Sequence, residues 1–111
     1  MVRCWIRFLL PREGGRVDFP VGPEYRAELR VRGSSAPDEA WTAVFLFASG
    51  DGGSLRQAVV RFLAKDAPHF ALQHGAEFDL YEGPKRVAEG AATPVVSLAE
   101  IRREYEARLR A

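Results

Sequence analysis

Residues 2–10, Val-Arg-Cys-Trp-Ile-Arg-Phe-Leu-Leu, decide the fold of this chain. Apolar residues stand at every second position of the stretch, at Val2, Cys4, Ile6, Phe8 and Leu10. A period of two is that of a β-strand, whose successive side chains point to opposite faces. We therefore expect a strand from Val2 to Leu10, with Cys4, Ile6 and Phe8 buried and with Arg3 and Arg7 exposed.

Five further stretches have the pattern of short strands, and turn residues separate them. They are residues 27–32, 41–48, 55–64, 77–82 and 86 to about 93. Stretch 41–48 is apolar on both faces, so we expect its outer face to be covered as well. Six short strands with this spacing favour a closed antiparallel barrel or a sandwich. We predict the barrel, an all-β six-stranded antiparallel β-barrel, because closure removes exposed strand edges.

The last segment has the pattern of a helix. Ser97 and Glu100 form a capping box at its start, and apolar residues follow at helical spacing. A helix of this length is marginal alone in water. We expect residues 97–111 to pack on the barrel formed by residues 1–96, with a partner protein as the alternative. Trp5 is then covered by the helix, and Arg3 and Arg7 pair with Glu100 or Glu104.

Composition limits the class of protein. A chain of 111 residues with 47% hydrophobic and 28% charged residues is one globular domain. The net charge of +1 gives no general attraction to nucleic acid. The single Cys4 fits a reducing compartment, and the sequence pattern leads us to expect no signal peptide and no membrane-spanning stretch. We expect a cytoplasmic protein with no membrane contact.

A turn-rich stretch, residues 12–26, follows the first strand. Gly14 and Gly15 allow a sharp reversal of the chain, which presents Arg12 and Arg16. Prolines at positions 20 and 23 then stiffen the loop before the second strand.

Two blocks of sequence carry a resemblance to a known family. The first is Glu13-Gly14-Gly15-Arg16 with Pro20 and Tyr25-Arg26, and the second is Gly75, Phe78, Glu82-Gly83 and Val87. Together they resemble the third domain of translation elongation factor Tu, over residues 3–95. In that family the domain is a small antiparallel β-barrel, which packs on the GTPase domain and holds part of the aminoacyl-tRNA backbone.

The resemblance implies a nucleic-acid-binding surface formed by Arg16, Arg26, Glu82 and Gly83. The chain departs from the family pattern where Val17 replaces a histidine and where Ala27-Glu28 replaces Pro-Gln. A carboxylate at position 28 repels phosphate, so we expect weak tRNA binding or none. The chain contains neither the Gly-x-x-x-x-Gly-Lys-Ser/Thr motif nor the Asn-Lys-x-Asp motif of a GTPase.

No group of residues has the pattern of a catalytic or metal site. His69 and His74 stand in a loop without further ligands at suitable spacing, and Ser49 and Ser54 lack an activating histidine motif. Glu77 and Asp79 share one face of a strand, as solvated carboxylates do. We therefore predict a protein that is not an enzyme and that needs no cofactor or metal.

Two functions remain open for such a domain. The first is RNA or tRNA binding, in which arginines interleaved with an exposed Trp5 hold a backbone and stack on a base. The second is a protein-interaction module whose barrel and helix bind a partner, such as a separately encoded GTPase domain.

Overall fold

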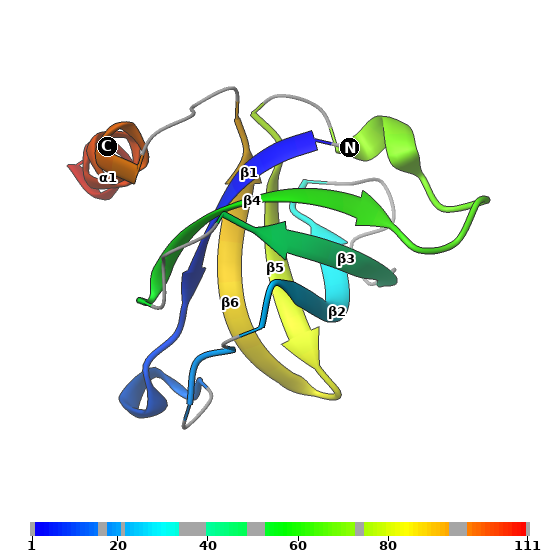
Figure 1. The fold of residues 1–111 in the computed structure, drawn as a ribbon, viewed down its shortest axis with the longest axis horizontal. Coiled ribbons are helices and arrows are strands. Elements are labelled where there is room, and N and C mark those ends of the chain that lie inside the picture. The colour runs from blue at the N-terminus through cyan, green and yellow to red at the C-terminus, as the bar shows by residue number, and fades with distance from the viewer. Residues whose placement is uncertain are drawn as a thin grey trace.

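The computed structural model describes residues 2–15, 18–20, 22–33, 40–48, 53–72, 75–93 and 98–110. Within these residues six strands curve around a common interior, and one helix lies outside them (Figure 1). The strands are β1 (Val2–Phe8), β2 (Glu24–Val31), β3 (Trp41–Phe47), β4 (Leu55–Phe62), β5 (Glu77–Glu82) and β6 (Lys85–Ala92). The helix is α1 (Leu98–Arg110), and two 3-10 turns span Pro11–Glu13 and His69–Ala71.

The strands close into a barrel in the order β1-β4-β3-β2-β5-β6, and β6 pairs with β1 to complete the ring. Every neighbouring pair is antiparallel. The predicted fold class, a six-stranded antiparallel β-barrel with a C-terminal helix, is therefore confirmed.

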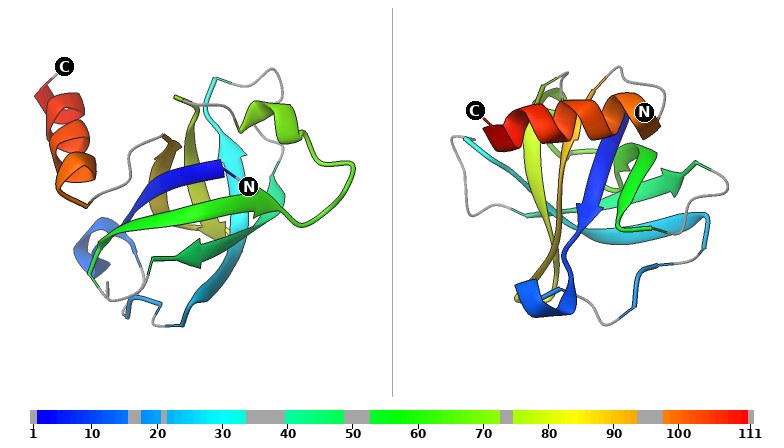
Figure 2. Two further views of the ribbon diagram at one scale, coloured as in Figure 1. Left: turned by 45° about the horizontal axis from the view of Figure 1, so that its top comes forward. Right: turned by 90° about the vertical axis from the view of Figure 1, so that its left-hand side faces the viewer.

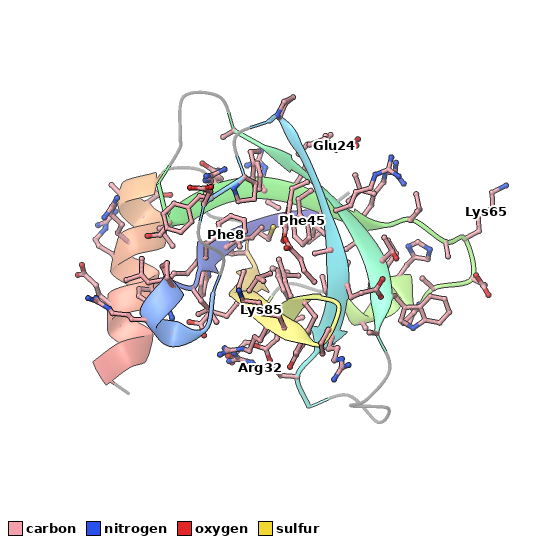
Figure 3. All side chains as sticks on the ribbon, turned by 90° about the horizontal axis from the view of Figure 1, so that it is seen from below. Phe8, Glu24, Arg32, Phe45, Lys65 and Lys85 are labelled. Carbon is pink, nitrogen blue, oxygen red and sulfur yellow. The ribbon has the colours of Figure 1, made fainter. Side chains whose placement is uncertain are left out.

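The interior follows the period of two in the sequence. Cys4, Ile6 and Phe8 are fully buried, as predicted, and Phe8 and Phe45 are seen inside the barrel in Figure 3. Strand β1 ends at Phe8, two residues earlier than expected, because a 3-10 turn begins at Pro11. The prediction that Arg7 is exposed is wrong: its side chain is only 19% exposed, because it is engaged by neighbouring side chains.

One inward-facing residue is charged. Arg56 lies on the same face of β4 as Ala58, and it is buried near one end of the interior. Its guanidinium lies 5.3 Å from the ring centroid of Phe8 and 4.8 Å from that of Phe47. Its Nε donates a hydrogen bond of 2.8 Å to the carbonyl of Gly53. Aromatic faces and a backbone acceptor thus stabilise this buried charge.

The outer face of β3 is only partly covered. Val44 is buried, but Leu46 is 38% exposed. The prediction that the outer face of stretch 41–48 is covered is therefore wrong at Leu46. The reason is the position of α1, which packs on residues of β1, β4 and β6 and leaves β3 open.

Glycines allow the close approaches that the barrel needs. Gly14 has a φ of +86°, which confirms the sharp reversal after β1. On β6, a Cβ at Gly90 would lie 2.4 Å from the carbonyl oxygen of Trp5 and 2.7 Å from the ring of Phe78. The absence of a side chain at position 90 lets β1 and the Phe78 ring pack closely.

Helix α1 crosses the outer side of the barrel (Figure 2). Tyr105 packs against Trp5, Leu55 and Ala91, and it leaves Trp5 only 1% exposed. The prediction that the helix covers Trp5 is confirmed. The predicted cap Ser97 and the side chains of Leu98, Ile101 and Glu104 lie outside the described part of the structure. No helix among the described residues is long and apolar enough to cross a membrane.

Candidate functional site

Three of the four residues that the family resemblance implies come together on the barrel surface. Arg26, Glu82 and Gly83 line one shallow depression of about 220 Å³, together with Ala27, Glu28, Thr42 and Tyr81. The fourth residue, Arg16, lies outside the described residues.

Strand pairing explains this arrangement. Glu28 of β2 lies opposite Tyr81 of β5, so the outward side chain of Arg26 lies beside the end of β5. Gly83 follows directly and has a φ of +62°, which lets the chain turn into β6. Residues far apart in the sequence thus meet beside the β5–β6 turn. We call the shallow hollow that they line the Arg26 depression.

The charge of the Arg26 depression is unfavourable for a phosphate. The Nε of Arg26 lies 3.3 Å from a carboxylate oxygen of Glu24, and Glu28 and Glu82 both line the depression. Three carboxylates thus accompany one exposed arginine, and like charges repel.

The two lining carboxylates are also engaged by the protein itself. The Thr42 hydroxyl donates a 2.9 Å hydrogen bond to Glu28. The hydroxyl of Tyr25, which reaches out from the core, donates a hydrogen bond to Glu82. Tyr25 therefore orients Glu82 from inside the barrel, whereas the neighbouring Arg26 faces solvent.

A second group of arginines lies on the outer faces of β1 and β6. Arg7 donates two hydrogen bonds, of 3.1 and 3.2 Å, to the two carboxylate oxygens of Glu13. It also lies 3.4 Å from Glu89. Glu13 in turn accepts a 2.9 Å hydrogen bond from the backbone N–H of Leu10. The hydrogen bonds from Arg7 and from Leu10 lower the pKa of Glu13.

The ion pairs continue from Glu89 towards β2 and β5. Arg86 bonds both Glu89 and Asp79, each at 2.9 Å. Arg32 lies 2.6 Å from Asp79, 3.4 Å from Glu77 and 3.4 Å from Glu89. We call this connected set the ion-pair network: Arg7, Glu13, Arg32, Glu77, Asp79, Arg86 and Glu89. Sequence reasoning treated Glu77 and Asp79 as solvated carboxylates and missed their arginine partners.

The network also changes the titration of Asp79. Burial alone would raise the pKa of Asp79, but the hydrogen bonds from Arg32 and Arg86 outweigh it and hold the pKa below its ordinary value. Asp79 therefore stays ionised, and the arginines of the network are neutralised within the protein.

The surface around β1, β3 and β4 has a different character. A depression of about 440 Å³ is lined by Arg3, Leu46, Phe47, Ala48, Gln57, Ala58 and Val59. We call it the Leu46 depression. Sequence reasoning missed it, although the apolar residues on both faces of stretch 41–48 were a signal that could have pointed to it.

Reactive groups within the described residues are few. The thiol of Cys4 is fully buried, and burial raises its pKa, so it is a poor nucleophile. His69 lies 3.1 Å from each of two backbone carbonyls, those of Ala64 and Lys65. No group of three or more histidine, cysteine or acidic residues in the described part is placed to hold a metal ion. Positions 49, 51 and 74 lie outside it.

Comparisons with known proteins add no relative. No protein-family model matches the chain, and no curated protein matches it significantly. The resemblance to the third domain of elongation factor Tu therefore stays a prediction based on the two sequence blocks.

Proposed function

We propose that this chain is a non-catalytic binding module whose ligand is a protein. The observation that carries the proposal is the local neutralisation of the arginines at two places, the Arg26 depression that the family resemblance implies and the ion-pair network. At the Arg26 depression one arginine is accompanied by two lining carboxylates and by a third carboxylate, that of Glu24, with which it pairs. In the ion-pair network three arginines face four carboxylates. A nucleic-acid backbone needs arginines that are free to replace its counterions.

The position of Trp5 supports the same proposal. Proteins that bind single-stranded RNA commonly use exposed aromatic rings that stack on bases. Trp5, the aromatic residue expected to serve this purpose, is buried under Tyr105. By the family resemblance, a separately encoded GTPase domain is one candidate partner.

RNA or tRNA binding is the second candidate function. The gathering of Arg26, Glu82 and Gly83 in one depression favours it. The Gly83 turn offers backbone groups to a ribose–phosphate chain, as the family's turn does. Glu24 and Glu28 oppose it, and we expect any affinity to be weak and only slightly dependent on salt.

The experiment that separates the two functions is a titration of labelled total tRNA with the purified chain at low salt. Arg26→Glu is the test variant, and Arg103→Glu, a change at an exposed arginine of α1, is the matched control. We expect weak or no binding, with no difference between the variants. Tight binding that Arg26→Glu abolishes and Arg103→Glu preserves would establish the RNA function.

A second experiment searches for a protein partner of the chain. Proteins retained by the chain from nuclease-treated extract are identified, purified and titrated one by one by calorimetry. We expect at least one direct partner, whose affinity does not depend on RNA. If every retained protein binds only in the presence of RNA, the proposal is wrong.

A further inference from the structure

The Leu46 depression has a simple geometry. Leu46 of β3 lies opposite Val59 of β4, and Val59 lies opposite Arg3 of β1. These three outward residues therefore form a row across three strands. Arg61 lies two residues from Val59 on the same outer face, opposite Val44. Arg3 and Arg61 thus flank an apolar centre on two neighbouring strands. On the other side of Leu46, Glu24 of β2 lies opposite it, and the Glu24 carboxylate is 3.3 Å from the Nε of Arg26.

The arginines at this surface differ from those of the ion-pair network. Arg3 and Arg61 are both exposed, and within the described residues neither forms an ion pair. Among the described residues no carboxylate lines the Leu46 depression, and the neighbouring Glu24 is paired with Arg26. By contrast, Arg7, Arg32 and Arg86 each bond carboxylates. Positive charge is therefore available for a ligand at this surface.

The closed barrel limits how a partner binds here. All six strands are paired on both sides, so a partner strand cannot add to an edge of the sheet. Binding must use side chains. An apolar side chain fits against Leu46 and Val59, and carboxylates suit the fork of an arginine, which can bind them through two hydrogen bonds.

We infer that the Leu46 depression is a docking site for an acidic segment of a partner protein that carries an apolar anchor residue. The inference rests on the proposed protein-binding function and names the surface and the partner's chemistry. A nucleic acid fits this surface less well. Its lining is mostly apolar, and the ring of Phe47 stacks on Tyr25, with centroids 6.0 Å apart.

A random 12-residue peptide library displayed on phage, selected against the intact chain, tests the inference. We expect the enriched peptides to carry an apolar residue flanked by aspartate or glutamate. Synthetic copies should bind the chain and lose at least about tenfold in affinity with Leu46→Glu and with the double change Arg3→Glu and Arg61→Glu, since central apolar anchors and desolvated charge pairs dominate binding. The control is the double change Arg102→Glu and Arg103→Glu at exposed positions of α1, which alters the charge as much as the double change at Arg3 and Arg61, and it should bind like the unaltered chain.

The variants change exposed residues, and circular dichroism checks that each still folds. The inference would be overturned if the library yields no enriched peptides or if the enriched peptides share a basic sequence. It would also be overturned if their binding does not change with Leu46→Glu. If binding is lost with the double change on α1 instead, the location is wrong and the protein-binding function survives. If tRNA binds tightly while no peptide does, the proposed function itself fails. Tight tRNA binding that the double change abolishes would assign this surface to nucleic acid.

Discussion

The ring of Tyr105 meets the ring of Trp5 edge to face, with centroids 5.5 Å apart and planes inclined by 72°. This contact joins the helix α1 to the outer face of β1. The guanidinium of Arg7 lies 5.6 Å from the Tyr105 ring centroid and adds to the same cluster. A helix that is marginal alone is thus held on the barrel by one aromatic anchor and its neighbours.

Replacement of Tyr105 by alanine should loosen α1. We expect a loss of about 1–2 kcal/mol in the free energy of unfolding, from the aromatic pair and the buried area. Trp5 fluorescence, measured in a Trp41→Phe background, should shift to longer wavelength as the indole meets water. Tyr105→Phe should retain most of the stability, and Glu106→Ala, on the exposed side of the same helix, is the control. An unchanged Trp5 spectrum in Tyr105→Ala would contradict the docking of α1 through this residue.

Arg56 provides a test of the barrel interior. Truncation to alanine removes the stacking on Phe8 and Phe47 and the hydrogen bond to Gly53. We expect the free energy of unfolding, measured by urea denaturation, to fall by about 2–4 kcal/mol. Arg56→Met keeps much of the volume and should cost less. If Arg56→Ala costs no more than a typical surface change, roughly 0.5 kcal/mol, the described packing is wrong.

Gly90→Ala should be strongly destabilising. The added Cβ would lie 2.4 Å from the carbonyl oxygen of Trp5, and this backbone atom cannot move without disturbing the pairing of β1 with β6. We expect the free energy of unfolding to fall by at least about 1–3 kcal/mol, which lowers the midpoint of thermal unfolding. Gly22→Ala is the matched control, because its Cβ would meet its nearest neighbour, the carbonyl oxygen of Glu24, at an ordinary 3.8 Å. Equal midpoints for the two variants would contradict the close approach of β1 and β6.

The ion-pair network predicts a loss of stability in acid. The pKa of Asp79 is lower in the folded chain than in the unfolded chain. Its stabilising contribution is therefore fully present above the unfolded pKa, about 4, and is lost as the pH falls through the folded pKa. The urea concentration at the midpoint of denaturation should decrease as the pH is lowered below about 4. In Asp79→Asn this decrease should be smaller. Asp66→Asn, in an exposed loop, is the control. An identical pH dependence in Asp79→Asn and the unaltered chain would exclude this role of Asp79.

The fold could be predicted from the sequence because its strands repeat a local pattern. The alternation in residues 2–10 identified Cys4, Ile6 and Phe8 as interior residues, and each is buried. The buried position of Arg56 was not predicted, because a charged residue at an inward position is acceptable only when specific rings and a carbonyl lie around it. Those partners come from separate parts of the chain, and a pattern of period two does not reveal them.

The candidate site was predictable only in part, for a similar reason. The family resemblance brought together Arg26, Glu82 and Gly83, and the structure places them in one depression. Whether an arginine is available depends on partners far away in the sequence, such as Arg32 and Asp79, which are 47 residues apart. Register across the closed barrel decides these pairs, and the sequence alone did not supply that register.

The most direct test of the central claim, that the ligand is a protein, is cross-linking in living cells from two positions. A photo-cross-linking amino acid replaces either Leu46 or Arg26 in the full chain, and the adducts are identified as protein or RNA. We expect a discrete protein adduct from position 46 that Arg61→Glu abolishes, and no RNA adduct from position 26. RNA adducts from position 26, with no protein adduct from position 46, would contradict the central claim.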